Sequence, residues 1–255
     1  MTIPTPSLIK TIRDIIIFEL NEDQIMVIGC DSTGGIGPKP LDKIRVDGYT
    51  LGKYTARVAL MEVLSVGAKP VCLIDTLSVE LEPTGTEIMN GIRDEVKVAG
   101  LDPTLAITGS SEKNIPVEQT GMGVTVVGMA RKELLRMGLS KPKDVVAVIG
   151  IPCVGNEVVT AEKEKKIAEI SDLLNLLNAE YIHDIISVGS RGIGYEAWTL
   201  GKESDLKFLV ADQQEIDLKK SAGPATVILV SLPYHKLVEL RKIIRKPINI
   251  AGYLF

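Results

Sequence analysis

Residues 24–39 read Gln-Ile-Met-Val-Ile-Gly-Cys-Asp-Ser-Thr-Gly-Gly-Ile-Gly-Pro-Lys, an apolar run that leads straight into a glycine-rich segment. The apolar part predicts a strand from Gln24 to Gly29. Asp31 follows this strand after one residue. We therefore expect its carboxylate at a strand end, beside a flexible loop.

The glycine-rich segment has the composition of an anion-binding loop. Gly34, Gly35 and Gly37 would let backbone amides approach an anion closely. Lys39 would add a positive charge to the same loop. The segment fits neither the P-loop pattern nor Gly-x-Gly-x-x-Gly, so a plain turn remains the alternative to a phosphate cradle.

Periodicity and Gly or Pro punctuation predict mixed secondary structure through the rest of the first half. The expected strands cover residues 14–19, 71–79, 105–108 and 121–130, and the expected helices cover residues 51–66 and 83–100.

The segment Gly138 to Lys143 combines a glycine, a proline and charges between two apolar runs, which is typical of a domain boundary. We expect an N-terminal domain over residues 1–138 and a C-terminal domain over residues 139–255. The second domain is expected to hold strands over residues 145–149 and 226–231, a helix over residues 233–244, and a helix that starts near Thr160 with Ile167, Ile170, Leu174 and Leu177 on one face.

Composition excludes several classes of function. The net charge of −4 and the 4% of aromatic residues argue against a nucleic-acid partner. No apolar run is long enough to cross a membrane, and residues 1–10 lack the apolar stretch of a signal peptide. Three widely spaced cysteines suit a reducing compartment. We therefore expect a cytoplasmic protein.

Four acids of the first half stand in apolar surroundings, where an ionised carboxylate is costly unless it is paired or binds a metal. Asp31 and Glu112 each follow a predicted strand, Glu62 leaves an apolar patch of a helix, and Asp75 lies inside a strand. Each acid alone could be satisfied by a buried cation or a backbone donor. Together they favour a shared site for a hard cation, and Mg²⁺ prefers such oxygen ligands.

A second glycine-rich loop, Gly189 to Gly194, precedes a predicted helix that contains Trp198. Such a helix entry can bind phosphate. Arg191 could form an ion pair with the phosphate, and the amide of Gly192 could contact it. A tight turn with a solvated arginine explains the same sequence equally well.

The ordered set of motifs resembles the AIR synthase and thiamine-monophosphate kinase superfamily. The segment 31–39 is similar to its Asp-Gly-Val-Gly-Thr-Lys loop, and residues 58–70 resemble the helix that ends in Gly-Ala-x-Pro. The strand with Asp75 is similar to Leu-Asp-Tyr, and residues 108–112 resemble Gly-Gly-Glu-Thr. The forms Asp-Ser-Thr-Gly-Gly-Ile-Gly and Ile-Thr-Gly-Ser-Ser-Glu-Lys-Asn look most like the α-ribazole kinase group of cobalamin salvage.

The resemblance implies an α+β fold of two domains, an N-terminal mixed sheet with packed helices and a C-terminal α/β sandwich. It also implies binding of ATP and Mg²⁺ and a homodimer formed through the N-terminal domains. The expected magnesium ligands are Asp31, Glu62, Asp75 and Glu112, with Asp31 and Glu112 as the catalytic acids. The expected nucleotide-binding residues are Gly34, Gly35, Gly37, Lys39, Arg191 and Gly192.

The expected function is an ATP-dependent kinase of a small nucleoside-like molecule, with the ribose hydroxyl of α-ribazole as the acceptor. Two alternatives stay open: an ATP-dependent ribonucleotide ligase or cyclase of the AIR synthase type, and a nucleotide-binding protein without catalytic activity. The chain lacks the Asp-Asp pair of thiamine-monophosphate kinase, since Cys30 precedes Asp31.

Overall fold

The structure is a computed structural model that describes residues 9–213 and 215–255. The chain forms two compact units, one ending at Leu135 and the other beginning at Arg136. Most of the stretch 1–10, where we expect no signal peptide, lies outside the described residues. Within the described part of the chain, no helix combines the length and the apolar character needed to cross a membrane.

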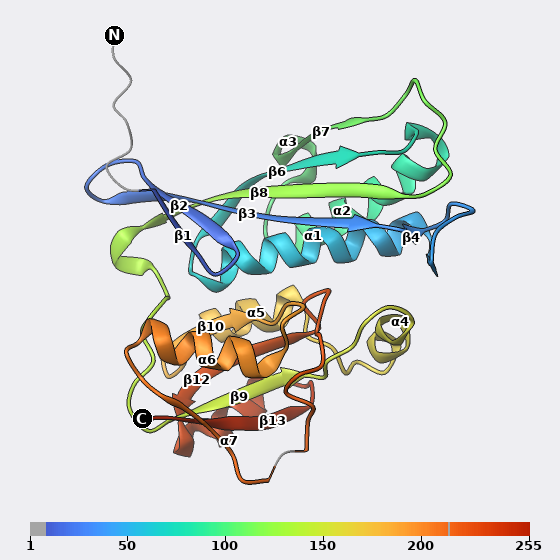
Figure 1. Ribbon diagram of the computed structural model, residues 1–255. Helices are drawn as coiled ribbons and strands as arrows, with labels where there is room; N and C mark the ends of the chain where they lie inside the picture. Colours follow the sequence, from blue (N-terminus) through green and yellow to red (C-terminus); the bar gives the residue numbers. More distant parts are fainter. Residues whose placement is uncertain (1–8, 214) are drawn as a thin grey trace. The chain divides into compact units, whose positions relative to one another are not determined.

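The first unit is built on one six-stranded sheet, seen edge-on in Figure 1. Only β6 and β7 pair in parallel, and the other neighbours are antiparallel. The spatial order is β1 (Ile9–Ile12), β2 (Ile15–Glu19), β3 (Gln24–Gly34), β8 (Gly121–Arg131), β6 (Lys69–Leu77) and β7 (Ile107–Ser111). Two short strands, β4 (Ile36–Gly37) and β5 (Ile44–Arg45), pair separately.

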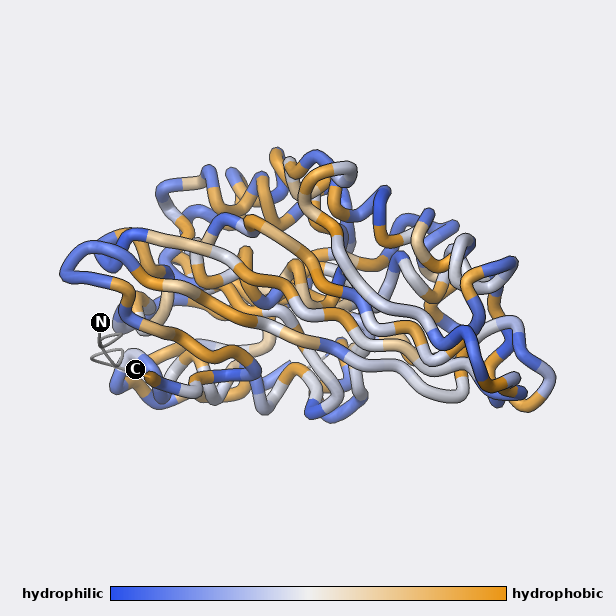
Figure 2. The backbone as a smooth tube through the Cα atoms, turned by 90° about the horizontal axis from the view of Figure 1, so that it is seen from above, coloured by the Kyte–Doolittle hydropathy of each residue, from blue (hydrophilic) through white to orange (hydrophobic). Residues whose placement is uncertain are grey.

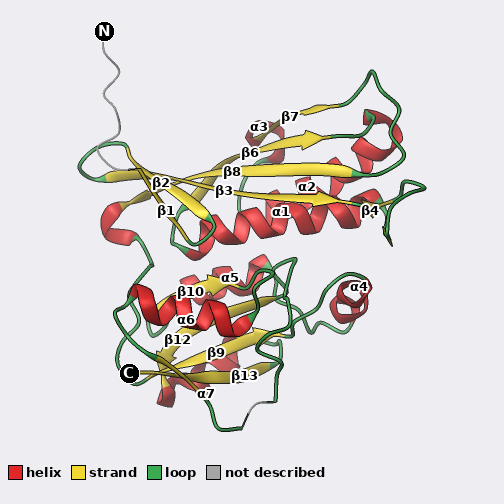
Figure 3. Cartoon of the chain, in the orientation of Figure 1, coloured by secondary structure: helices red, strands yellow, loops and turns green. Residues whose placement is uncertain are grey.

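Helices cover one face of this sheet (Figure 3). The long helix α1 (Gly48–Ser65) packs against β3, β8 and β6, and α2 (Thr86–Val98) packs on α1 after a short π-helical turn, η1 (Leu81–Gly85). Asp47 begins α1 by accepting a hydrogen bond from the amide of Thr50. Alternate residues of the strands, such as Ile25 and Val27, are buried beneath the helices.

Two predictions for the first unit are wrong in their bounds. The strand expected to end at Gly29 continues to Gly34, because residues 29–34 keep pairing with β8. The strand expected over residues 105–108 begins only at Ile107, after the helical turn α3 (Pro103–Ala106). The Asp102 side chain caps this turn by accepting from the Thr104 amide, and Pro103 suits its first position.

The second unit is a five-stranded antiparallel sheet with helices packed on it. The spatial order is β10 (Asp184–Ser187), β12 (Val227–Pro233), β9 (Asp144–Gly150), β13 (Ile248–Leu254) and β11 (Phe208–Val210). The helices are α4 (Asn156–Lys163), α5 (Ile170–Leu177), α6 (Ile193–Glu203) and α7 (Leu237–Ile243), and a short 3-10 turn, η3 (Tyr234–Lys236), precedes α7. Another short 3-10 turn, η2 (Lys132–Leu134), lies at the end of the first unit. All seven residues of β9 are buried, as expected for a central strand.

The single helix expected from Thr160 through Leu177 is wrong, because two helices share that segment. The helix α4 ends at Lys163, and Lys165 then adopts a left-handed conformation with φ 58°. A new helix begins where Glu169 and Asp172 form a reciprocal capping box. The expected α+β fold, with a mixed first sheet and a second sheet covered by helices, is confirmed.

Candidate functional site

Asp31 lies inside β3 and not at its end, which corrects the expectation from the sequence. It shares the helix-facing side of the strand with Ile25, Val27 and Gly29. Burial raises the pKa of Asp31 from 3.8 to about 6, although the Ser32 amide lowers the pKa by hydrogen bonding. A carboxylate is thus held between the sheet and the helix layer.

Glu62 reaches the same side of β3 from α1. The hydroxyls of Thr55 and Thr33 are 2.9 Å apart, and a Cβ at Gly29 would lie 3.2 Å from Oε2 of Glu62. These two contacts show that α1 runs antiparallel to β3, with Asp31 between them. The missing side chain at Gly29 leaves room for the Glu62 carboxylate on the side of β3 that Asp31 also faces.

Asp75 occupies the same row of the sheet, two strands away. Val124 of β8 pairs with Asp31 on one side and with Asp75 on the other. Asp75 is only 3% exposed, and burial raises its pKa to about 6 against the opposing effects of its own amide and of Arg93. Its carboxylate extends over Gly109 of β7, where a Cβ would lie 2.2 Å from Oδ2.

Glu112 directly follows β7, as expected from the sequence. Its Oε1 accepts hydrogen bonds from the amides of Asn114, at 2.7 Å, and Ile115, at 3.2 Å. These hydrogen bonds lower the pKa of the Glu112 carboxyl. The side chain therefore orders its own loop.

The four predicted acids do not form one metal centre in this chain. Within residues 9–213 and 215–255, no group of three or more His, Cys, Asp or Glu side chains could hold a metal ion. Magnesium, however, often uses one or two carboxylates and completes its shell with water and substrate phosphates. Asp31 and Glu62, both on the helix-facing side of β3, could supply such carboxylates.

The segment Gly34 to Lys39 turns sharply and is anchored to another loop. Gly35 has φ 72° and Gly37 has φ 146°, and a Cβ at Gly37 would lie 2.6 Å from Oγ1 of Thr120. The two glycines are therefore needed for the turn and for close packing. Asp42 holds the segment by accepting hydrogen bonds from the Lys39 amide and from the amide and hydroxyl of Thr120.

Lys39 does not point its charge at an open anion site in this structure. Its ammonium group forms an ion pair with Glu80, whose carboxylate also accepts a hydrogen bond from Thr84. The phosphate-binding role of this segment stays a prediction, and it would require Lys39 to exchange Glu80 for a phosphate.

A pocket of about 590 Å³ opens beside Asp75, between β6, β7 and the α2 side of the unit. Arg93 and Lys113 supply cations, Ser110 and Asn114 supply hydrogen-bonding groups, and Met89 contributes an apolar wall. Sequence reasoning missed Arg93 and Met89 as pocket residues. Their positions four apart on α2 were visible, but their proximity to Asp75 was not.

The second glycine-rich loop is closely packed in the second unit. Gly192 has φ 83°, and a Cβ there would meet the carbonyl oxygens of Leu218, Lys219 and Lys220 at 2.9 to 3.0 Å. The Leu218 carbonyl also accepts a hydrogen bond from the Gly194 amide at the start of α6. Three carbonyl oxygens would repel an anion, so this geometry supports the turn interpretation of Gly192.

Arg191, in the same loop, lies against an aromatic ring. Its guanidinium carbon is 4.6 Å from the ring centroid of Tyr195, and it donates a hydrogen bond to the Tyr195 hydroxyl. This stacking accounts for an exposed arginine without a phosphate. A phosphate contact of Arg191 stays a prediction.

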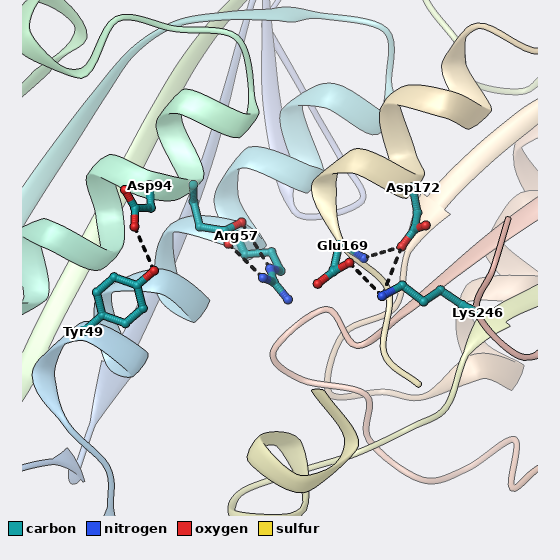
Figure 4. A network of polar contacts seen from close by, with 7 residues as sticks. Tyr49, Arg57, Asp94, Glu169, Asp172 and Lys246 are labelled. Carbon is teal, nitrogen blue, oxygen red and sulfur yellow. Dashed lines mark hydrogen bonds and ion pairs between the residues drawn. The ribbon is translucent and has the colours of Figure 1, made fainter. Parts of the chain in front are cut away.

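Two polar networks, shown in Figure 4, connect elements within the two units, and the one in the first unit is buried. In the first unit, Arg57 of α1 contacts Glu95 of α2 through two hydrogen bonds of 2.8 and 3.2 Å. In the second unit, the Lys246 ammonium lies 2.7 Å from Glu169 and 4.0 Å from Asp172 at the start of α5. Both networks stabilise packing between elements.

A comparison with protein-family models finds a match in the first unit. Residues 13–130 match the model described as AIR synthase related protein, N-terminal domain. This match lies within the first unit and spans less than half of the chain. A comparison with curated proteins finds no match.

Several solved structures share the fold along most of this chain. T. maritima PurL complexed with ADP is 16% identical, with a TM-score of 0.66. The match covers 98% of this chain but only 43% of the PurL chain. Thiamine-monophosphate kinase from Stenotrophomonas maltophilia K279a is 14% identical with a TM-score of 0.63, covering 95% of this chain and 86% of that chain. AaThiL complexed with AMPPCP and TMP is 12% identical, with a TM-score of 0.62, and the match covers 94% of this chain and 84% of the AaThiL chain. At such low identities, these TM-scores show a shared AIR synthase-like fold and nothing further.

Proposed function

We propose that this protein is an ATP- and Mg²⁺-dependent kinase of a small hydroxylated molecule. The observation that carries the proposal is that Asp31 and Glu62 both lie on the helix-facing side of β3. The fold is shared with a thiamine-monophosphate kinase and with AaThiL complexed with AMPPCP, an ATP analogue. Both likenesses extend over most of the two chains that are compared.

Asp31 and Glu62 would hold Mg²⁺, which would supply charge neutralisation for the phosphates when it is bound. The role of this chain is then to position two substrates and to exclude water. No covalent enzyme intermediate is needed for that chemistry. Glu112 contributes by ordering the loop that follows β7.

The acceptor in the proposal is α-ribazole, whose ribose hydroxyl would be phosphorylated in cobalamin salvage. Its support is the sequence resemblance of residues 31–37 and 107–114 to the α-ribazole kinase group. The test is ADP formation by the purified protein with Mg-ATP, with and without α-ribazole. Acceptor-dependent ADP together with a product heavier by one phosphate is the expected result.

A ligase or cyclase of the AIR synthase type is the second candidate, because PurL structures share this fold over nearly the whole chain. The mass of the product separates the two candidates. A kinase adds a phosphate to its acceptor, whereas a cyclase removes water from its substrate.

We further propose that the first unit forms a homodimer through the face of its sheet that the helices leave uncovered. One row of that face consists of Ile16, Ile28, Val127 and Cys72, which pair across β2, β3, β8 and β6. In Figure 2, long stretches of the strands of this sheet carry the colour of hydrophobic residues. Ile16 and Ile74 are each 37% exposed, and an apolar sheet face of this kind favours association.

A further inference from the structure

The ion pair between Lys39 and Glu80 connects two segments that lie 41 positions apart in the chain. The Lys39 ammonium group lies 2.5 Å from Oε2 of Glu80, and Oε1 of the same carboxylate accepts a hydrogen bond of 2.5 Å from the Thr84 hydroxyl. The carboxylate is thus shared between a cation and a hydroxyl. Lysine ammonium groups and hydroxyls are also donors to phosphate oxygens.

The chain that joins β3 to α1 supplies the positive charge at this place. It carries three cations, Lys39, Lys43 and Arg45, against two acids, Asp42 and Asp47. Both acids accept hydrogen bonds from backbone amides, and Asp42 is buried. Glu80 therefore brings a carboxylate from a distant segment to a stretch of chain with a surplus of positive charge.

Lys39 and Glu80 can separate without loss of local structure. The Asp42 carboxylate accepts a hydrogen bond of 2.8 Å from the Lys39 amide, and the Arg45 guanidinium donates to the Lys39 carbonyl, so the backbone of Lys39 is held independently of Glu80. After separation, the Glu80 carboxylate would keep the Thr84 hydroxyl as a partner. Breaking the ion pair therefore moves a lysine side chain and leaves both segments in place.

The ion pair is exposed enough for its partners to exchange. The side chains of Lys39 and Glu80 are 18% and 35% exposed, so water and salt weaken their attraction. A phosphate group carries roughly 1.5 to 2 negative charges at neutral pH and three strong acceptor oxygens, whereas a carboxylate carries a single charge. A phosphate brought to this place would attract the Lys39 ammonium group more strongly than Glu80 does.

We propose that Glu80 is a latch on Lys39: its carboxylate holds the ammonium group in the ligand-free protein, and a phosphate group of the bound nucleotide displaces it. This inference rests on the proposed ATP-dependent function and adds a control of the nucleotide site. Because the nucleotide must compete with an internal acid, removal of that acid should tighten nucleotide binding.

Glu82 provides a matched control for Glu80. Its carboxylate accepts a hydrogen bond of 2.5 Å from the Thr86 hydroxyl four residues later, just as Glu80 accepts one from Thr84. Among the residues that the structure describes, Glu82 forms no ion pair. The two acids thus share a segment and a local hydrogen bond, and they differ in the contact with Lys39.

A double-mutant cycle in the full chain tests the latch. Glu80→Gln keeps the shape of the side chain and can still bond Thr84, but it removes the charge that holds Lys39. Lys39→Met removes the ammonium group and keeps an unbranched side chain. Calorimetry in Mg²⁺ measures the Kd of AMPPCP and, separately, of inorganic tripolyphosphate for the unmodified protein, the two single variants, the double variant and Glu82→Gln.

Glu80→Asp is a second variant that keeps the charge. Its side chain is shorter by one methylene group, so its carboxylate cannot reach both Lys39 and Thr84. It should tighten binding in the same direction as Glu80→Gln. Thermal melting followed by circular dichroism checks that each variant is folded, and a variant that does not fold leaves the other to decide.

We expect Glu80→Gln to tighten binding of both probes about two- to fivefold, the range for a partly exposed ion pair. Lys39→Met should weaken binding about tenfold or more, as for loss of a charge-assisted hydrogen bond. In the Lys39→Met background, Glu80→Gln should change nothing, because no ammonium group remains to be released. Glu82→Gln should bind both probes like the unmodified protein.

A gain from Glu80→Gln that persists in the Lys39→Met background would reveal general repulsion between the acid and the anion, and it would overturn the latch. Unchanged or weaker binding in Glu80→Gln, equal binding in Lys39→Met and the unmodified protein, or no binding of either probe would overturn it as well. The kinase proposal is judged apart, by ADP formation in the unmodified protein. Binding that follows the cycle without acceptor-dependent ADP would sustain the latch and remove the kinase.

Discussion

Asp31 and Asp75 lie in one row of the first sheet, and each pairs with Val124 from an opposite side. Since neighbouring strands are about 4.8 Å apart, the two backbone positions are separated by roughly 10 Å. Both side chains face the helices, with Glu62 on the Asp31 side and the pocket on the Asp75 side. In our proposal the Asp31 end of this row contributes to the site for magnesium and ATP.

Replacing the proposed magnesium ligands should remove metal-dependent nucleotide binding. Asp31→Asn or Glu62→Gln should lower kcat by roughly 100-fold or more, because charge neutralisation at the phosphates is lost. Calorimetry with AMPPCP, in Mg²⁺ and in EDTA, measures nucleotide binding, and steady-state kinetics with ATP measures kcat. Glu22→Gln, at an exposed turn between β2 and β3, is the matched control. Magnesium-dependent AMPPCP binding that survives in both variants would place the cation elsewhere.

The buried carboxyl of Asp75 should make the metal-free protein more stable as the pH falls towards 4. Burial raises the pKa of Asp75 from 3.8 to about 6, so the folded state binds this proton more tightly than the unfolded state. Ionised Asp75 therefore costs stability above pH 6, on the order of 2 to 3 kcal/mol, and the cost disappears as the pH falls through 6 towards 3.8. Urea unfolding of Asp75→Asn in EDTA should show a gain at pH 7.5 and almost none at pH 4. An equal gain in stability at both pH values would show that burial does not raise the pKa of Asp75 in the folded protein. The exposed Asp23→Asn serves as the control.

The buried pair of Arg57 and Glu95 should be necessary for packing of α2 on α1. Arg57 is only 2% exposed and binds Glu95 with two hydrogen bonds, so Arg57→Met leaves a carboxylate buried without this partner. Loss of one member of a buried pair typically costs about 3 to 5 kcal/mol. Urea unfolding followed by circular dichroism measures the cost.

The double variant with Glu95→Leu is the informative comparison for that pair. Removing both charges should recover most of the loss, because no uncompensated charge stays buried. A double variant as unstable as Arg57→Met would mean that packing of the arginine stem, and not its charge, carries the stability.

A charge on the uncovered face of the first sheet should break the proposed homodimer. Ile16→Lys and Ile74→Lys each place an ammonium group among apolar side chains that would meet a second copy. Light scattering after size exclusion should give a dimer for the unmodified protein and a monomer for the variants. Val98→Lys, which changes an exposed valine on α2, should remain dimeric. A monomer measured for the unmodified protein would contradict the proposed homodimer.

Local pattern was sufficient for several features of the first unit. The alternation of Leu73, Asp75 and Leu77 predicts a half-buried strand with an acid on its apolar face, and the structure confirms it. The position of Asp31 was wrong because Ser32 to Gly34 look like a loop, whereas pairing with β8 extends the strand. Tertiary pairing overrides the low strand propensity of such residues.

Contacts between distant segments could not be predicted from the sequence alone. The ion pair of Lys39 joins residues 41 positions apart, and the placement of Asp75 over Gly109 depends on the register of two parallel strands. Arg93 becomes a pocket residue only because α2 packs beside the sheet. Each of these relationships arises from register and helix packing, which one sequence does not reveal.

Formation of ADP from Mg-ATP by the purified protein, measured with and without α-ribazole, tests the central claim most directly. The kinase account predicts ADP that appears only when the acceptor is present, in equal amount to a product that has gained one phosphate. AMPPCP binding without any acceptor-dependent ADP, or a product that has instead lost water, would contradict it.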